Sequence, residues 1–318
     1  MKALSIIGPT AVGKTSFALE LATEILEKKD YVGVVLISAD SRQVYQGLEI
    51  TTGADVPAEF ELIKSAKFNY PFFKKGKIQL HGVSIISPDQ EWSVAHFQDL
   101  ARQIIHLAKK NNHLPIVIGG TGLYHQQLLN SDPSLRVKPN VEVRQKAEDL
   151  ELEALQSWAK EVNPDRFEQL NNSDLNNPRR LVRVIEIGLA GDRHLKKSNP
   201  SVDQIYLGLN QNLDKIEQKI KKRVLSRFDG KSIAEINKLQ QQYQDWSLPA
   251  LSALGVSEVS QYLNGLLSRE ECSKLWALHE LQYARRQLTW WRRKNVTWFK
   301  IDEPKWKAQA FAYILSSC

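Results

Sequence analysis

The chain has 318 residues, of which 42% are hydrophobic and 25% charged, and its formal net charge is +7. This composition excludes a disordered or fibrous protein, and the length suffices for one large α/β domain with an elaboration or for two domains. The basic balance permits a polyanionic partner without requiring one. The two cysteines, Cys272 and Cys318, have no close Cys or His neighbours, so neither a disulfide framework nor a zinc site is indicated.

The first residues carry no pattern for membrane insertion. The apolar run at residues 3–7 ends at Gly8, which makes it too short for the core of a signal peptide or for a membrane span. We therefore expect a cytoplasmic protein without a membrane partner.

The N-terminal part alternates apolar runs with a helical pattern. Residues 3–7 predict a strand, residues 8–15 a glycine-bounded loop, residues 16–29 an amphipathic helix, and residues 32–37 a second strand. Strands that are apolar almost throughout are typical of parallel sheets buried on both faces. The pattern therefore predicts a βαβ unit.

The pattern continues with further strands and a helix. Residues 81–86 predict a strand, residues 94–107 a helix, and residues 116–118 another strand. Together these segments predict a doubly wound parallel sheet, with any site at the carboxyl ends of its strands.

The middle of the chain changes character. Residues 128–190 have no strand pattern, and helices are predicted at 141–162 and 179–189. A strand at 205–209 returns to the sheet, and amphipathic helices follow near residues 213–228, 233–243, 248–263 and 269–293. We expect a core domain with C-terminal helices at 1–127 and 195–318, and a helical insertion domain at 128–194.

The loop after the first strand fits a phosphate-binding pattern. It consists of Gly8, Pro9, Thr10, Ala11, Val12, Gly13, Lys14 and Thr15, and it stands between a strand and a helix as a P-loop requires. Its amides and the helix N-terminus would hold phosphate oxygens, Lys14 would add a cation, and Thr15 would bind Mg²⁺. This predicts binding of a diphosphate or triphosphate, and leaves kinases, ATPases and other transferases open.

A carboxylate, Asp40, follows the second strand. It suits a magnesium ligand or a general base beside the phosphates. The residues around it read DSRQVY at 40–45 and LEITTG at 48–53. Three later blocks are GGTGLY at 119–124, NPRRLVRVIE at 177–186 and YARRQLTW at 283–290. In this order behind a P-loop, the blocks resemble those of the tRNA dimethylallyltransferases, the IPP transferase family, over almost the whole chain.

The resemblance implies an activity. A member would move the dimethylallyl group of dimethylallyl diphosphate onto the exocyclic N6 of the adenosine at tRNA position 37, next to the anticodon, and give N6-isopentenyladenosine. It implies Mg²⁺ as cofactor, a tRNA with adenosine 3′ of the anticodon as partner, and a monomer. An adenylate isopentenyltransferase, a small-molecule P-loop kinase and a noncatalytic RNA-binding ATPase remain alternatives.

The resemblance also implies roles for single residues. Asp40 would be the general base, Thr121 would contact the reacting groups or a diphosphate oxygen, and Arg223 would contact the diphosphate from outside the P-loop. An exposed charge among neighbouring lysines is the alternative for Arg223. The expected tRNA contacts are Asp40, Ser41, Arg42, Gln43, Thr121, Arg179, Arg180, Leu181, Val182, Arg183, Arg285 and Arg286. An ordinary solvated helix face is the alternative for the arginines at 179–183.

The C-terminal part departs from the family pattern. Residues 254–258 read LGVSE where Ile-Gly-Tyr-Lys-Glu is usual, and Glu280-Leu281 replaces Thr-Arg. On the last long helix, Leu278, Leu281, Leu288 and Trp291 are predicted to share the buried face. Core positions are favoured over base stacking for Trp290, Trp291 and Trp298.

Overall fold

The computed structural model describes residues 3–54, 56–65, 68–129, 132–191, 204–244, 246 and 248–317. The chain divides into two compact units. The main unit comprises Met1–Leu129 and Ser201–Cys318, and the inserted unit comprises Asn130–Pro200.

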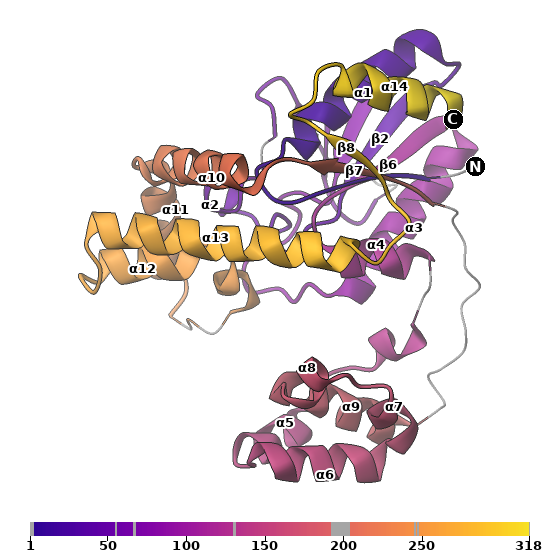
Figure 1. Ribbon diagram of the computed structural model, residues 1–318. Helices are drawn as coiled ribbons and strands as arrows, with labels where there is room; N and C mark the ends of the chain where they lie inside the picture. The colour runs from indigo at the N-terminus through magenta and orange to yellow at the C-terminus, as the bar shows by residue number, and fades with distance from the viewer. Residues whose placement is uncertain are drawn as a thin grey trace. The chain divides into compact units, whose positions relative to one another are not determined.

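The main unit is built on an eight-stranded sheet with the strand order β3-β4-β5-β2-β6-β1-β7-β8 (Figure 1). Its parallel strands are β1 (Ala3–Ile7), β2 (Gly33–Ser38), β5 (Ile78–His81), β6 (His113–Ile118), β7 (Gln204–Asn210) and β8 (Thr297–Lys300). An antiparallel hairpin of β3 (Glu61–Ile63) and β4 (Phe72–Lys75) completes one edge. β1 and β2 are buried along their whole length, as strands covered by helices on both faces must be.

Helices cover both faces of this sheet. One face packs against α1 (Lys14–Lys28) and α14 (Trp306–Ser317), which lie side by side in Figure 1. The other face packs against α3 (Val94–Lys110) and α4 (Gly122–Leu129), and its core continues into the remaining helices of the main unit. These are α2 (Glu49–Thr52), α10 (Leu213–Phe228), α11 (Lys231–Gln242), α12 (Val256–Leu263) and α13 (Arg269–Trp291). The sequence prediction of a doubly wound α/β fold is confirmed.

None of the helices in the described ranges combines the length and the apolar character that crossing a bilayer requires. The longest of them, α13, has 23 residues and is charged along much of its surface.

The strand predicted at residues 81–86 is wrong. β5 ends at His81, and the apolar residues after it lie in a buried loop. This loop is held by backbone bonds to the segment after β2, in which Ile85 N donates to Val44 O at 2.7 Å. Tyr45 and Ile86 form an isolated parallel bridge here, so the loop has the apolar composition of a strand without a continuous ladder.

The buried face of α13 also differs from the prediction. Leu281 and Trp291 are buried as expected, but Leu278 is 49% exposed. The face instead includes the polar residues Glu280 and Gln287, which are 4% and 5% exposed. Buried polar side chains need partners, and the partners of these two lie in the candidate site.

The inserted unit is helical. It contains a short 3₁₀ turn (Pro133–Arg136) and the helices α5 (Val141–Glu148), α6 (Leu152–Val162), α7 (Pro164–Glu168), α8 (Asn172–Leu175) and α9 (Pro178–Ala190). The single helix predicted at 141–162 is therefore two helices. Their small core includes Leu155, Ala159, Val184 and Leu181, which is completely buried. The side chain of Leu181 is thus a core residue and cannot make the predicted tRNA contact.

Candidate active site

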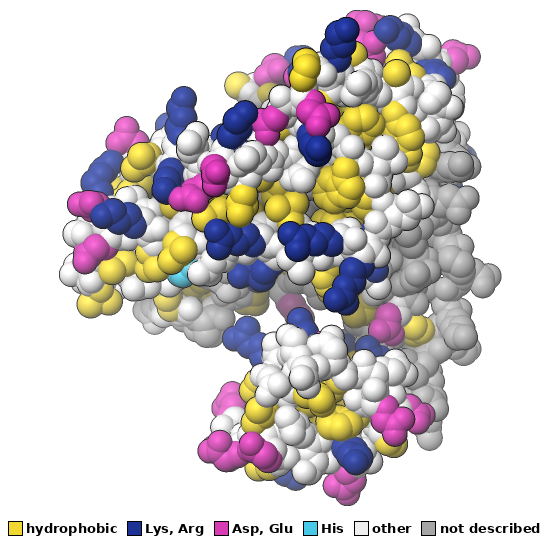
Figure 2. All heavy atoms as spheres, in the orientation of Figure 1, with side chains coloured by type: hydrophobic (Ala, Val, Ile, Leu, Met, Phe, Trp, Pro, Cys, Tyr) yellow, Lys and Arg dark blue, Asp and Glu magenta, His cyan; other side chains and the backbone are white. Residues whose placement is uncertain are grey.

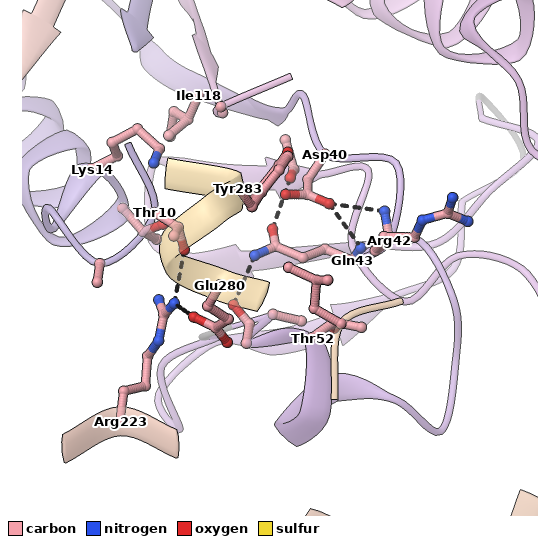
Figure 3. A pocket seen from close by; sticks show the side chains of 18 of the residues that line it. Thr10, Lys14, Asp40, Arg42, Gln43, Thr52, Ile118, Arg223, Glu280 and Tyr283 are labelled. Carbon is pink, nitrogen blue, oxygen red and sulfur yellow. Dashed lines mark hydrogen bonds and ion pairs between the residues drawn. The ribbon is translucent and has the colours of Figure 1, made fainter. Parts of the chain in front are cut away.

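A cavity of about 950 Å³ opens in the main unit at the carboxyl ends of three neighbouring strands. Its wall is formed by the P-loop after β1, the loop after β2 and the loop after β6, and it is completed by side chains of α10 and α13 (Figure 3). The carboxyl ends of parallel strands are where doubly wound folds bind ligands.

The P-loop takes the conformation that its sequence predicts. Ala11 and Gly13 have positive φ angles of 63° and 92°, which turn the backbone toward the start of α1. Lys14 donates from Nζ to the carbonyl oxygens of Gly8 and Pro9 at 3.0 and 2.8 Å. An ammonium group has three donors, so the third is left for a ligand. Desolvation lowers the pKa of Lys14 to about 8, with Asp40 raising it and Arg223 lowering it further.

Gly8 must be glycine for a steric reason. Its φ is 146°, and a Cβ atom at this position would stand 2.3 Å from the carbonyl oxygen of Leu209 in β7. The close approach of these two backbones fixes the position at which the chain leaves β1 and begins the P-loop.

Two helices from the end of the chain hold the tip of the P-loop. The backbone N–H of Thr10 donates to Oε1 of Gln287 in α13 at 2.8 Å, and the Thr10 hydroxyl accepts from Nη2 of Arg223 in α10 at 2.8 Å. Gln287 also lies against the loop after β6, because a Cβ atom on Gly120 would stand 1.7 Å from its Nε2. Sequence reasoning missed Gln287, although it lies in the last of the recognised blocks.

Arg223 lines the cavity, and its side chain is 23% exposed. Arg223 forms an ion pair with Glu280 of α13. Oε1 of Glu280 is also 3.6 Å from Nη1 of Arg227. The alternative of a freely solvated charge on α10 is therefore wrong for Arg223. Glu280 is a second residue that sequence reasoning did not place in the site, because a carboxylate on an amphipathic helix is normally an outward-facing residue.

Asp40 faces the P-loop across the cavity. Its Oδ1 accepts from the backbone N–H groups of Arg42 and Gln43 at 2.8 and 3.3 Å (Figure 3). Among the described residues these are its only hydrogen bonds, so Oδ2 keeps its lone pairs for a ligand. The loop is fixed further because Gln43 donates to Gly53 O at 2.7 Å and Arg42 donates to Pro249 O at 2.6 Å.

Tyr283 of α13 extends into the cavity near Asp40 (Figure 3). Burial, and after it the negative charge of Asp40, raises the pKa of Tyr283 to about 12. The hydroxyl of Thr121 is buried and makes no hydrogen bond of ordinary geometry within the described residues. Thr121 does not line the cavity, whereas the neighbouring Gly119 and Gly120 do. The structure thus brings Lys14, Asp40 and Arg223 together and adds Tyr283 to them.

Comparison with known proteins identifies the family of the chain. A family model described as IPP transferase matches residues 43–294. The chain belongs to the IPP transferase family. The tRNA dimethylallyltransferases of Moorella thermoacetica and Halothermothrix orenii are 31% and 32% identical to it. These matches cover 95% of this chain and 90% and 88% of the two relatives.

Solved structures of the IPP transferase family share the fold. The full-length tRNA isopentenylpyrophosphate transferase of Bacillus halodurans is 29% identical, with a TM-score of 0.67 over 99% of this chain and 96% of that one. A eukaryotic dimethylallyltransferase acting on tRNA has a TM-score of 0.75 at 21% identity, over 99% of this chain and 78% of the other. The latter likeness is one of fold.

The arginines expected at the tRNA differ in their surroundings. Arg179 is exposed and has no hydrogen bond or ion pair within the described part of the chain. Arg180 is exposed and pairs with Asp174. Arg183 donates to Ser134 O and Val137 O at 2.8 and 2.7 Å and to the buried Glu186 at 3.0 Å. The guanidinium of Arg183 therefore ties the start of the inserted unit to α9.

Exposed basic residues gather along the second half of α13 and just after it, as the space-filling view shows (Figure 2). Arg286 reaches the cavity itself, while Arg285, Arg292 and Arg293 face solvent. Both arginines of the last family block are thus accessible to a ligand.

The tryptophans near the end of α13 have different environments. Trp291 is 2% exposed and packs against the rings of His125 and Tyr206 at 5.5 and 5.4 Å, so the predicted core position is confirmed. Trp290 is 40% exposed, and the core position is wrong for it. Its ring covers Gly122, where a Cβ atom would stand 2.1 Å from it. Trp298 is half-buried against Gly208.

Proposed function

We propose that this protein is a tRNA dimethylallyltransferase that transfers the prenyl group of dimethylallyl diphosphate to N6 of adenosine 37. The observation that carries the proposal is that Asp40 lies across the cavity from the P-loop, whose Lys14 lines the same cavity as Arg223 of α10. Membership of the IPP transferase family supports it, as do relatives named for this activity.

The chemistry requires help at both ends of the reaction. The exocyclic amine of adenine is a weak nucleophile because its lone pair is delocalised into the ring. The allylic carbon must therefore lose its diphosphate readily, and the amine must lose a proton. Cations and backbone donors that face the leaving group lower the barrier because they stabilise charge as it develops.

The P-loop side of the cavity would bind the diphosphate leaving group. The free N–H of Lys14, the backbone amides of the loop and the guanidinium of Arg223 would bind its oxygens. Tyr283 would lie near the reacting carbon, since it lines the cavity next to Asp40.

Asp40 would accept the proton that the amine loses. Its Oδ1 is held by two backbone donors, which leaves Oδ2 to accept the amine proton as the N–C bond forms. A base fixed in this way needs no reorientation during the reaction.

Magnesium fits the residues present. Within the described residues no group of three His, Cys, Asp or Glu side chains forms a ready metal site. Mg²⁺ needs none, because it commonly keeps several waters and binds through one or two protein oxygens plus phosphates. Thr15 lines the cavity and would supply that oxygen. When bound, the ion would neutralise part of the charge on the departing diphosphate.

The adenine must leave its stack to reach this cavity. Ser41 and Arg42 line the cavity next to Asp40 and would contact the base, while the amide of Gln43 is already engaged by the protein. Arg179, Arg180, Arg285 and Arg286 would hold phosphates of the anticodon arm. We place the reaction in the cytoplasm, where tRNA and the donor meet.

The test offers three acceptors to the purified protein with Mg²⁺ and labelled dimethylallyl diphosphate. Label should enter a tRNA that has adenosine at position 37 and should not enter the same tRNA with guanosine there. Transfer to AMP would instead identify an adenylate isopentenyltransferase. Rapid hydrolysis of ATP without prenyl transfer would identify a kinase or ATPase.

A further inference from the structure

Glu280 is a buried carboxylate on the wall of the candidate site. It is 4% exposed, lies near the middle of α13 and faces the cavity that we assign to the donor diphosphate (Figure 3). A carboxylate is costly to bury unless charged partners compensate it. An anion at this position would by itself repel a diphosphate, so its partners determine what it does.

Three donors surround the carboxylate of Glu280. Oε2 pairs with Nη2 of Arg223, Oε1 accepts from Nε1 of Trp276 at 3.2 Å, and Oε1 is 3.6 Å from Nη1 of Arg227. Both arginines line the cavity, so a single carboxylate holds two cations at the diphosphate side. The three charges sum to +1, which still favours an anionic ligand.

Arg223 keeps donors for a ligand while Glu280 holds it. Arg223 contacts the P-loop through Thr10 Oγ1 at 2.8 Å, and its Nε is buried with no hydrogen-bond partner within the described residues. Arg227 is packed so closely on Gly53 that a Cβ atom there would stand 1.8 Å from its Nη2. A guanidinium has five N–H donors, of which the carboxylate occupies only a part.

We propose that Glu280 is a positioning residue for the donor diphosphate: it fixes the guanidinium of Arg223 beside the P-loop before the ligand binds. The inference rests on the proposed function, because it takes the cavity to be the diphosphate site. A long side chain loses much rotamer entropy when it is immobilised, and a partner that immobilises it beforehand removes this cost from binding.

The experiment measures binding of inorganic diphosphate by calorimetry in the presence of Mg²⁺, with the whole protein and no turnover. Glu280→Ala should weaken binding about tenfold, which corresponds to about 1.4 kcal/mol. Glu280→Gln should weaken it less, about threefold, because the amide oxygen still accepts from Arg223 while the charge is lost. Thermal unfolding of each variant checks that it is folded.

A matched control is available on the neighbouring helix. Glu258 of α12 is 3% exposed and pairs with His279, but it does not line the cavity. Glu258→Gln should leave diphosphate binding unchanged even if it lowers the unfolding temperature. It separates the general effect of losing a buried carboxylate from the positioning role.

A double-mutant cycle with Arg223→Ala decides whether Glu280 acts through Arg223. In that background Glu280→Ala should cause almost no further loss, since the group that it positions is absent. Unchanged or tighter diphosphate binding in both Glu280 variants would overturn the inference, because removal of a mere negative charge tightens anion binding. So would equal losses with and without Arg223.

Prenyl transfer by the wild-type protein separates this inference from the proposed function. If the wild type binds diphosphate but does not prenylate tRNA, the proposed function fails and the positioning of Arg223 is still tested by the binding data. If the wild type prenylates tRNA and the Glu280 variants bind diphosphate normally, only the positioning role fails.

Discussion

The geometry around Asp40 makes its replacement by asparagine an informative test of general-base catalysis. Oδ1 accepts from Arg42 N at 2.8 Å and from Gln43 N at 3.3 Å. In Asp40→Asn the carbonyl oxygen must stay on these two donors, since an amide nitrogen there would face two N–H groups. The amide nitrogen then takes the place of Oδ2. The loop keeps its conformation, while the atom that faces the cavity becomes a donor and can no longer accept a proton.

The expected loss therefore appears in kcat. Removal of a general base typically lowers the rate by about 10² to 10⁴, equivalent to about 2.7 to 5.5 kcal/mol of transition-state stabilisation. The KM for tRNA should change by less than about threefold, because the donors and the loop are retained. Incorporation of labelled dimethylallyl groups into tRNA, followed under single-turnover and steady-state conditions, measures both quantities.

Asp302 provides the control for this experiment. It also accepts from a backbone N–H, that of Asn212 at 2.9 Å, but it does not line the cavity. Asp302→Asn should retain wild-type kcat. If Asp40→Asn keeps kcat within about tenfold of the wild type, the carboxylate is not the base, and its role would be to shape the loop.

Four further predictions concern the rest of the site and the inserted unit. Because the pKa of Lys14 is about 8, affinity for inorganic diphosphate should fall as the pH rises through 8. Calorimetry at pH 7 to 9 should show a smaller loss of diphosphate affinity for Lys14→Arg than for the wild type. Equal losses in the two proteins would contradict this prediction. In Gly119→Ala, the new Cβ would stand 2.3 Å from Ala39 O, next to Asp40. The backbone must move, so we expect prenyl transfer to drop at least tenfold with diphosphate binding retained. Arg183→Ala should destabilise the protein by about 1 to 3 kcal/mol in urea unfolding, because it leaves Glu186 short of a partner. Replacement of both Arg179 and Arg180 by alanine should instead reduce the slope of log K for tRNA binding against log salt concentration by about 0.7 to 0.9 per lost contact. An unchanged slope would make these two arginines an ordinary solvated face.

The fold was predictable where local pattern and tertiary environment agree. β1 and α10 lie at the predicted residues because each is a plain apolar or amphipathic run. The hairpin of β3 and β4 was missed because both strands are short and lie at the edge of the sheet. Exposed residues such as Glu61 and Lys74 there leave no apolar strand pattern in the sequence. The strand after residue 81 was misplaced because burial, rather than pairing, makes that loop apolar.

The site was predictable where one segment carries the chemistry. The P-loop and Asp40 follow directly from short motifs at the ends of strands. Glu280 and Gln287 did not, because periodicity assigns polar residues to the exposed side of a helix, whereas α13 buries both against Arg223 and Thr10. Only the tertiary structure shows that polar residues of the last long helix complete a loop at the start of the chain.

The long separation between the P-loop and its supports has a consequence for synthesis of the protein. β1 pairs with β7, in which Leu4 is the register partner of Ile205, and Thr10 is bonded to a residue 277 positions later. At roughly 5 to 20 residues per second, translation delivers Gln287 about 15 to 55 s after Thr10. β7 itself is made about 10 to 40 s after β1 on the same scale. Until then one edge of β1 has no strand beside it, and an unpaired apolar edge promotes association between chains. We therefore expect the nascent chain to be most prone to association before β7 has emerged from the ribosome.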